Sequence, residues 1–253
     1  MTLNAAQSPK SWPYSKWIAH RGAGTLAPEN TLAAFRKGAE YGYRMFECDA
    51  KLSADDVVFL MHDATLQRTT NCHGIGGEQS WQELSQLDAG SWHSRHFSGE
   101  PLPTLANLAH YCILNGYFLN IEIKPTPGLE FKTGEIVAQQ AAQLWQHEAV
   151  PPLLTSFQVE SLKGAQKAAP QLPRGLLLHN LPEGWLDTAK SLDCCAVVCQ
   201  YALWTNESVA AVHSAGMRCL SYTVNDEWAI QHLMALGTDG IITDRVDAFS
   251  PAT

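Results

Sequence analysis

Positive charge is scarce in this chain of 253 residues. It has 17 lysine and arginine residues against 25 aspartate and glutamate residues, for a net charge of -8. No lysine- or arginine-rich run occurs. Since sequence-independent binding of nucleic acid needs a basic surface, we expect no nucleic-acid partner. The acidic balance still permits a phosphate-bearing substrate, because a bound divalent cation can reverse the local field.

Long hydrophobic runs are also missing. No stretch of about 18 apolar residues occurs. Residues 1–12 also lack the apolar core and the small-residue cleavage pattern of a signal peptide. We therefore expect a cytoplasmic protein without stable membrane anchoring. The sequence leaves no trace of its oligomeric state.

Paired cysteine motifs are missing as well. The seven cysteines form no Cys-x-x-Cys pair, and their odd number argues against a disulfide framework. Free thiols in this number fit a reducing compartment. Cys194, Cys195 and Cys199 lie close enough in sequence to suggest a metal site. They fall in an apolar run typical of a buried strand, however, where cysteine behaves as a small hydrophobic residue.

What is present is a regular alternation of short apolar runs and longer helical patterns, which predicts parallel strands joined by helical crossovers. Eight strands are the number that closes a (β/α)8 TIM barrel, an α/β fold that commonly takes about 250 residues. An open doubly wound sheet is the alternative, but its G-x-G-x-x-G turn after the first strand is missing. The strand candidates are residues 17–21, 45–51, 117–124, 153–157, 175–179, 196–200, 218–224 and 240–243, and the clearest helical patterns are 31–41, 104–115 and 133–147.

One long, turn-rich segment interrupts this alternation between the second strand and the helix at 104–115. Long loops within a compact domain are usually functional or form small modules. We therefore predict a single domain over residues 1–253 with a small insertion after the second strand, at about 65–103, over one end of the barrel. Residues 57–62 are predicted to form an additional hairpin strand, as the opening part of this interrupting segment.

Charged side chains at the ends of three apolar strands are informative, because burying a charge without a partner is costly. Residues two apart on a strand point the same way, and the carboxyl ends of barrel strands surround one mouth. These strand-end residues are His20 and Arg21, then Glu47 and Asp49, then Glu122 and Lys124.

Glu47, Asp49 and Glu122 would repel one another at this mouth unless a cation held them. Ligation by oxygen alone favours one hard divalent ion, Mg²⁺ or Ca²⁺ and also Mn²⁺, over zinc. The alternative is a layer of ion pairs with Arg21 and Lys124 that binds no metal.

His20 and His62 are the candidates for proton transfer, since histidine commonly does this work near neutral pH. Either histidine alone would more often be structural, but both lie beside the predicted carboxylate cluster. Arg21 and Lys124 supply positive charge for a phosphate. Together these residues suit phosphoryl transfer.

Other polar and aromatic residues give weaker signals. His93 and His96 fit a surface position better than a second site. Trp204 and Tyr222 fit core packing better than a place at the mouth.

These residues belong to ordered motifs that resemble the signature of glycerophosphodiester phosphodiesterases. The resemblance covers about residues 12–247 and is closest to the short cytoplasmic enterobacterial enzyme. Asp55-Asp56 stands where the family often has Asp-Gly, which puts the turn type in question but not the chemistry. The motifs are His20-Arg21-Gly22, Pro28-Glu29-Asn30-Thr31, Glu47-Cys48-Asp49, His62-Asp63, Leu66-Gln67-Arg68-Thr69-Thr70, Glu122-Ile123-Lys124-Pro125, Tyr222-Thr223-Val224-Asn225 and the stretch 239–244.

The resemblance implies metal-dependent hydrolysis of small glycerophosphodiesters to sn-glycerol 3-phosphate and an alcohol. It also implies a role for each site residue: Glu47, Asp49 and Glu122 bind the metal, His20 and His62 share the acid/base work, and Arg21 and Lys124 hold the phosphate. Which histidine is the acid stays open. So does the nucleophile, which is either the glycerol 2-hydroxyl, giving a cyclic intermediate, or water.

Two other functions stay open. A phospholipase D-like or phosphoinositide-cleaving enzyme on the same barrel would act at membranes, yet no amphipathic helix suited to docking is visible. A catalytically silent binding module would be indicated by loss of a ligand or a histidine, and none is lost.

Overall fold

The computed structural model describes residues 12–249 and 251. The strands among them are β1 (Trp17–Ala19), β2 (Met45–Leu52), β3 (Val58–Leu60), β4 (Phe118–Ile123), β5 (Leu153–Ser156), β6 (Arg174–Leu178), β7 (Ala196–Gln200), β8 (Arg218–Tyr222) and β9 (Gly240–Thr243). The α-helices are α1 (Leu32–Glu40), α2 (Trp81–Leu84), α3 (Leu105–Asn115), α4 (Glu130–Leu144), α5 (Val159–Ala168), α6 (Trp185–Ser191), α7 (Asn206–Ser214) and α8 (Glu227–Leu236). Short 3-10 helices are η1 (Gly76–Glu78), η2 (Arg95–Phe97) and η3 (Tyr201–Leu203).

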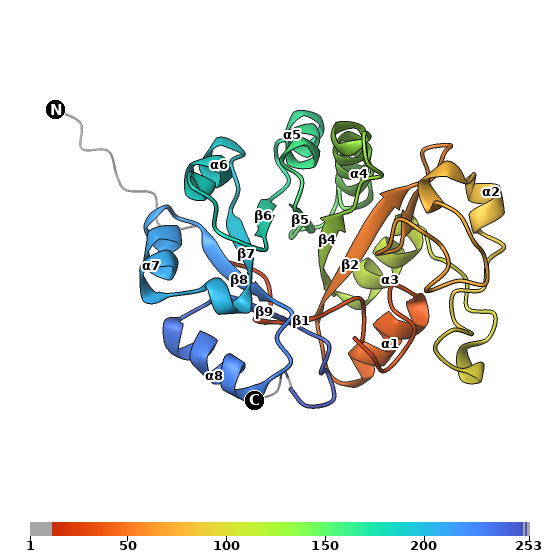
Figure 1. The fold of residues 1–253 in the computed structure, drawn as a ribbon, viewed down its shortest axis with the longest axis horizontal. Coiled ribbons are helices and arrows are strands. Elements are labelled where there is room, and N and C mark those ends of the chain that lie inside the picture. Colours follow the sequence, from red (N-terminus) through yellow and green to blue (C-terminus); the bar gives the residue numbers. More distant parts are fainter. Residues whose placement is uncertain (1–11, 250, 252–253) are drawn as a thin grey trace.

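Eight parallel strands close into a barrel. The order is β1-β9-β8-β7-β6-β5-β4-β2, and β1 pairs again with β2 to complete the ring. Helices α1 and α3–α8 surround these strands (Figure 1). The predicted (β/α)8 barrel is therefore confirmed.

Successive side chains on each strand point alternately into the barrel and out toward the helices, which gives two apolar layers. Ile18 and Ile242 point into the barrel with Leu177 and Leu220, whereas neighbours such as Ala19 pack outward against the helices. Tyr14 covers the barrel end opposite the carboxyl ends of the strands, and its hydroxyl donates to the Pro151 carbonyl. One end of the barrel is thus filled, and the polar residues lie at the other.

Local sequence sets the helix ends. The side chains of Thr31 and Thr104 accept hydrogen bonds from the first turns of α1 and α3, and Gly116 ends α3 in the left-handed region. Helix α4 begins three residues before its predicted start, directly after the Pro125–Gly128 loop, where proline and glycine disfavour helix. No helix among the described residues is long and apolar enough to cross a membrane.

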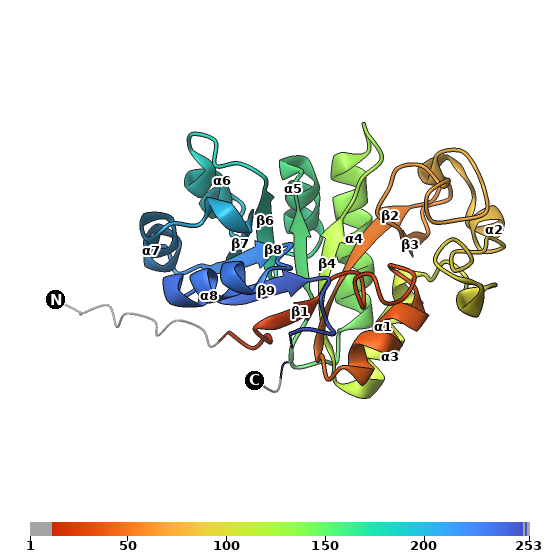
Figure 2. The same ribbon diagram turned by 60° about the horizontal axis from the view of Figure 1, so that its bottom comes forward.

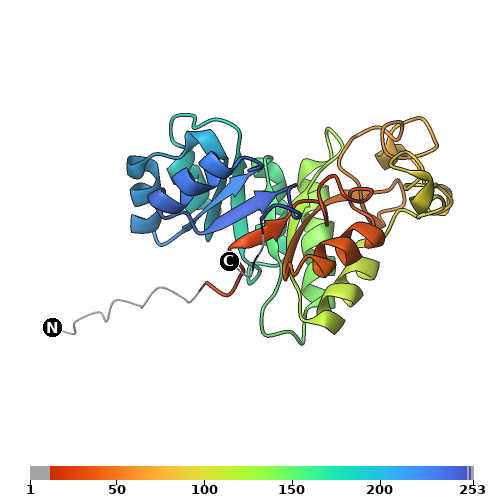
Figure 3. The same ribbon diagram turned by 90° about the horizontal axis from the view of Figure 1, so that it is seen from below.

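The insertion after β2 forms a separate lobe. It opens with β3, which pairs antiparallel with β2, so the predicted hairpin strand is present. Asp56 in the turn has a φ of 64°, the left-handed conformation that glycine adopts most easily. The lobe extends beyond the end of β2 and carries α2 (Figures 2 and 3). Its own apolar cluster includes Phe59 and Met61, so the segment predicted as the hairpin strand packs as part of the lobe.

Candidate active site

Strands β2 and β4 bring three carboxylates together at the barrel mouth. The strands are parallel neighbours, and Asp49 lies opposite Glu122 in their register. Glu47 precedes Asp49 by two residues and points to the same side. One oxygen from each of the three side chains lies within 4.8 Å of the others. Glu47 and Asp49 are only 2% and 1% exposed.

Burial and crowding strongly perturb these carboxyl groups. Burial raises the pKa of Glu47 well above its usual value, and the charges of Asp49 and Glu122 raise it further. Burial likewise raises the pKa of Glu122 to about 7. Burial acts to raise the pKa of Asp49 too, but the charges of Arg21 and Lys124 and the hydrogen bond from Asn30 contribute to a net lowering of that pKa.

Two buried oxygens in this cluster have neither a hydrogen-bond partner nor an ion-pair partner among the described residues. They are Glu47 Oε1 and Asp49 Oδ1. Buried acceptors are normally paired, because an unpaired one loses its water at a cost. A hard divalent cation accepts oxygen ligands of this kind, so the cluster fits such an ion.

Arg21 and Asn30 support the carboxylates from the loop between β1 and α1. Arg21 has a φ of 50°, and its backbone N–H donates to Glu47 Oε2 at 3.0 Å. Its Nε lies 3.2 Å from Asp49 Oδ2, without the alignment of a hydrogen bond. Asn30 donates from Nδ2 to Asp49 Oδ2 at 2.8 Å and accepts from the Asp49 N–H at 3.0 Å.

His20 is oriented by a carboxylate from the opposite end of the chain. Its Nδ1 lies 2.6 Å from Asp244 Oδ1, just after β9. Asp244 Oδ2 in turn accepts from Asn225 Nδ2 at 2.9 Å. The other ring nitrogen, Nε2, lies 3.8 Å from Glu47 Oε2. His20 therefore presents Nε2 toward the carboxylate cluster, and Asp244 limits its rotation.

His62 has a similar arrangement on the opposite side. Its Nδ1 lies 2.7 Å from Asp63 Oδ1, and its Nε2 lies 3.2 Å from Lys124 Nζ. Because an ammonium only donates, Nε2 is the acceptor and the ring is neutral with its proton on Nδ1. Burial lowers the pKa of His62, which favours this form. Lys124 Nζ also lies 3.0 Å from Glu122 Oε1.

An outer network connects Arg21 to His62. Arg21 donates to Glu29 at 2.9 Å, and Arg68 binds the same carboxylate through both terminal nitrogens at 2.7 Å. Arg68 also donates from Nε to Asp63 at 2.6 Å. Bidentate arginine–carboxylate contacts restrict orientation as well as distance. The insertion thus contributes Arg68 to the support of the mouth.

A narrow cavity lies beside the carboxylates. It is lined by His20, Glu47, Asn120, Glu122, Phe157, Leu177, Tyr222 and Ile242. Phe157 also borders two larger spaces, one of about 220 Å³ beside Lys124 and one of about 250 Å³ beside Trp185. Tyr222 therefore lines the mouth, where core packing was expected. Trp204 is buried as expected, and its Nε1 donates to the Leu220 carbonyl.

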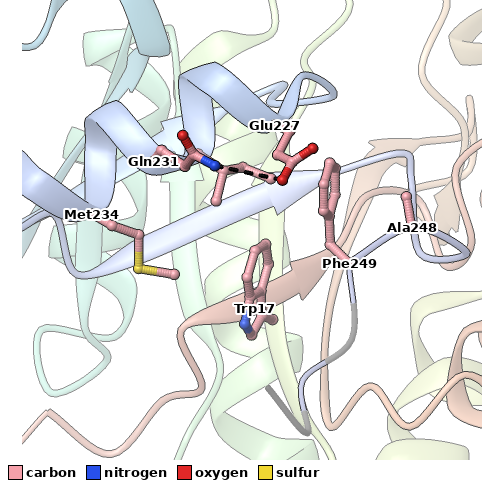
Figure 4. A pocket seen from close by; sticks show the side chains of 7 residues that line it. Trp17, Glu227, Gln231, Met234, Ala248 and Phe249 are labelled. Carbon is pink, nitrogen blue, oxygen red and sulfur yellow. Dashed lines mark hydrogen bonds between the residues drawn. The ribbon is translucent and has the colours of Figure 1, made fainter.

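A pocket of about 670 Å³ lies outside the barrel, between α8 and the segment after β9. Trp17 stacks on Phe249 at one side of it, and Gln231 and Met234 line another (Figure 4). Glu227 is its charged lining residue, so the pocket does not suit an anionic phosphate.

His213, Cys219 and Asp239 form a second group with metal-like ligand types, at the filled end of the barrel. Asp239 already accepts from His213 Nε2 at 2.8 Å, the Cys219 N–H at 2.8 Å and Arg218 at 3.0 Å. An arginine in the cluster supplies the charge that a cation would. His96 is exposed, as expected, while His93 contacts the Thr25 carbonyl at 2.9 Å.

The architecture is thus a closed (β/α)8 barrel whose mouth combines a candidate cation site, two oriented histidines and two basic side chains. The profile of the Glycerophosphoryl diester phosphodiesterase family matches residues 20–248. The chain therefore belongs to this family, as its motifs suggested.

Relatives and solved structures agree with this assignment. A glycerophosphodiester phosphodiesterase of Caldanaerobacter subterraneus is 33% identical over 232 residues, which cover 90% of this chain and 93% of that protein. The structure of an Oleispira antarctica phosphodiesterase in complex with the product sn-glycerol-3-phosphate matches with a TM-score of 0.86 and 31% identity, over 93% of this chain and 95% of that one. The Agrobacterium tumefaciens glycerophosphodiester phosphodiesterase matches with a TM-score of 0.72 and 29% identity, over 94% and 100%.

Three residues that support the site were not predicted as site residues from the sequence. Asp63 directly follows His62, and a carboxylate beside a histidine candidate is a usable signal. Asp244 follows the last predicted strand and so had to lie at the mouth. Asn30 lies in one of the ordered motifs, but its role could not be assigned from the sequence, because it depends on a loop that folds back onto Asp49.

Proposed function

We propose that this protein is a metal-dependent glycerophosphodiester phosphodiesterase that releases sn-glycerol 3-phosphate and an alcohol. The observation that carries the proposal is the convergence of Glu47, Asp49 and Glu122 between His20 and His62 at one barrel mouth. Family membership supports the reaction class, and the product bound to the Oleispira relative supports the substrate class.

In this proposal Glu47, Asp49 and Glu122 hold one Mg²⁺ or Ca²⁺ ion, and their oxygen ligands also accept Mn²⁺. When bound, the ion supplies positive charge that polarises the phosphate and favours deprotonation of the attacking hydroxyl. The two unpaired buried oxygens, Glu47 Oε1 and Asp49 Oδ1, support this arrangement. The competing layer of ion pairs leaves these two atoms without partners.

His20 and His62 move the protons in this proposal. One histidine accepts the proton of the attacking hydroxyl at Nε2, and the other donates a proton to the departing alkoxide. Asp244 and Asp63 each hold Nδ1, which leaves Nε2 of both rings for proton transfer, with Nε2 of His62 beside the Lys124 ammonium. Neutral His62 is suited to accept a proton at the start of the reaction.

Arg21 and Lys124 bind the phosphodiester. Arg21 is held by Glu29 and lies beside Asp49, while Lys124 lies between Glu122 and His62. Both are cations whose present partners are anionic or neutral site groups, so an incoming phosphate can share them. The two pockets that meet at Phe157 leave room for both ester arms.

The test is a metal-reconstitution series on EDTA-treated enzyme. Activity on glycerophosphocholine and glycerophosphoethanolamine should disappear on chelation and return with Mg²⁺ or Ca²⁺. Glu122→Gln, which removes one charged ligand, should weaken the response to metal, while Glu207→Gln on α7 should leave it unchanged. Full activity after chelation would contradict the metal requirement.

Two controls separate the competing functions. Cleavage of phospholipid vesicles in preference to soluble glycerophosphodiesters would favour a phospholipase-like enzyme. Binding of glycerophosphodiesters without turnover, at every metal tried, would favour a silent module.

A further inference from the structure

Lys51 is a buried cation that the proposed reaction does not use. It lies on β2, two residues after Asp49, and is only 2% exposed. Its neighbours in the sheet are β3 on one side and β4 on the other. A lysine side chain is seldom buried without a specific partner, because its charge loses water.

The partners of Lys51 are backbone carbonyls of two proposed functional residues. Its Nζ donates to the His62 carbonyl at 3.4 Å and to the Lys124 carbonyl at 3.3 Å. His62 follows β3 and Lys124 follows β4, so one ammonium on β2 connects both loops. Both hydrogen bonds are long, and the buried charge adds attraction to the two carbonyl dipoles.

The side chains of the same two residues also meet. Lys124 Nζ lies 3.2 Å from His62 Nε2, while Lys51 bridges their backbones. A small rotation of either loop would change that distance. A methionine, of similar length and without charge, would avoid the desolvation cost, so fold stability alone does not explain a lysine here.

We propose that Lys51 is a positioning residue, which fixes the His62 and Lys124 backbones so that the His62 imidazole and the Lys124 ammonium face the carboxylate cluster together. The effect on catalysis rests on the function proposed above. The contact itself does not.

The first test compares Lys51→Met with Lys51→Gln, whose neutral amide can still donate a hydrogen bond. Lys51→Met should lower kcat on glycerophosphocholine by roughly 10- to 100-fold, since small misplacements of catalytic groups have effects of that size. Lys51→Gln should recover part of the loss. A kcat within twofold of wild type for Lys51→Met would overturn the proposal, and Lys51→Leu, which also lacks a donor, is judged by the same criterion if the methionine variant does not fold.

Arg174 offers a matched control. It is 2% exposed on β6 and donates to the carbonyls of Pro170, Leu172 and Leu192 at the filled end of the barrel. Arg174→Met should lower the melting temperature and leave kcat of the folded enzyme unchanged. Lys51→Met should show the reverse pattern, with a large loss of kcat at a similar melting temperature.

A double-mutant cycle shows whether Lys51 acts through His62. Added to His62→Ala, Lys51→Met should reduce the remaining kcat by less than about threefold, because groups that act as a unit are not additive. If the double variant lost kcat by the product of the two single losses, Lys51 would not act through His62.

Hydrogen exchange supplies a readout independent of activity. The backbone amides of residues 61–64 and of Ile123, Lys124 and Thr126 should exchange faster in Lys51→Met than in wild type, and should be unchanged in Arg174→Met. Unchanged exchange in Lys51→Met would overturn the positioning role. An inactive wild type with faster exchange in Lys51→Met would instead count against the proposed function and leave the bridge supported.

Discussion

Each histidine at the mouth has a carboxylate on Nδ1, while Nε2 of His20 is directed toward Glu47 and Nε2 of His62 toward the Lys124 ammonium. Asp244 and Asp63 restrict the rings of His20 and His62 before substrate arrives. An oriented ring needs little rearrangement when the proton moves, which is the advantage of preorganisation. The same pairing engages both carboxylates with imidazole, so neither is included among the proposed cation ligands.

Replacing either histidine should remove a proton-transfer group. We expect His20→Ala and His62→Ala each to lower kcat by about 10²–10⁴-fold, the usual contribution of general acid/base catalysis. The measurement is steady-state hydrolysis of glycerophosphocholine at saturating Mg²⁺ or Ca²⁺. His96→Ala is the control, because His96 is exposed on the insertion. Near-normal turnover in either variant would refute the role of that histidine.

Asp244 should matter through its charge on the His20 ring. Asp244→Asn keeps the shape but removes the anion that stabilises a protonated imidazole, so kcat should fall at least tenfold with little change in KM. Asp187→Asn, at a surface ion pair with Lys190, is the matched substitution and should have no effect. A rise in KM alone would mean that Asp244 acts in binding and not on His20.

At the scale of elements, helices α4 and α5 pack closely against each other at two glycines. On α4, a Cβ added to Gly134 would meet the Ser161 carbonyl at 1.8 Å, and on α5 a Cβ added to Gly164 would meet the Phe131 carbonyl at 2.1 Å. Both neighbouring atoms belong to backbone and cannot swing aside. The two helices therefore touch through reciprocal glycines on the outside of the barrel.

Gly134→Ala should lower the free energy of unfolding by about 1–3 kcal/mol, the usual cost of forcing extra volume into a packed interface. Denaturant unfolding measures this loss, and kcat of the folded enzyme should not change. Gln139→Ala lies on an exposed part of α4 and should alter stability by less than about 0.5 kcal/mol. Equal stability of Gly134→Ala and wild type would mean that the helices can separate without loss.

At the scale of the whole molecule, the carboxylate cluster should make the free energy of unfolding depend on pH. Burial raises the pKa of Glu122 to about 7 and that of Glu47 well above its usual value. Without metal, the folded state therefore binds protons that the unfolded state releases between pH 4.5 and about 7. Stability of the metal-free protein should then fall as pH rises through that window.

Metal should reverse this trend. Because a bound cation displaces those protons, added Mg²⁺ or Ca²⁺ should raise the melting temperature more at pH 8 than at pH 6. Thermal scans of EDTA-treated protein with and without metal provide the comparison, and Glu122→Gln should reduce both the pH dependence and the metal effect. A metal-induced shift of equal size at both pH values would show that binding releases no proton.

Much of the fold followed from the sequence alone. Strand and helix periodicity is local, so eight alternating units and the charged strand ends at Glu47, Asp49 and Glu122 were visible without coordinates. Parallel strands bring their carboxyl ends to one mouth, and the clustering of these side chains was expected for that reason. The roles of the site residues and the identity of the metal stay predictions.

Contacts between distant segments were decided by the tertiary structure. His20 and Asp244 are 224 residues apart and meet because β1 pairs with β9 when the ring closes. The bridge from Lys51 to the carbonyls of His62 and Lys124 likewise depends on β3 and β4 flanking β2. The hydrophobic pattern of a strand predicts which face a side chain occupies. The residue that it contacts on that face depends on strand order and register, and these are properties of the closed barrel.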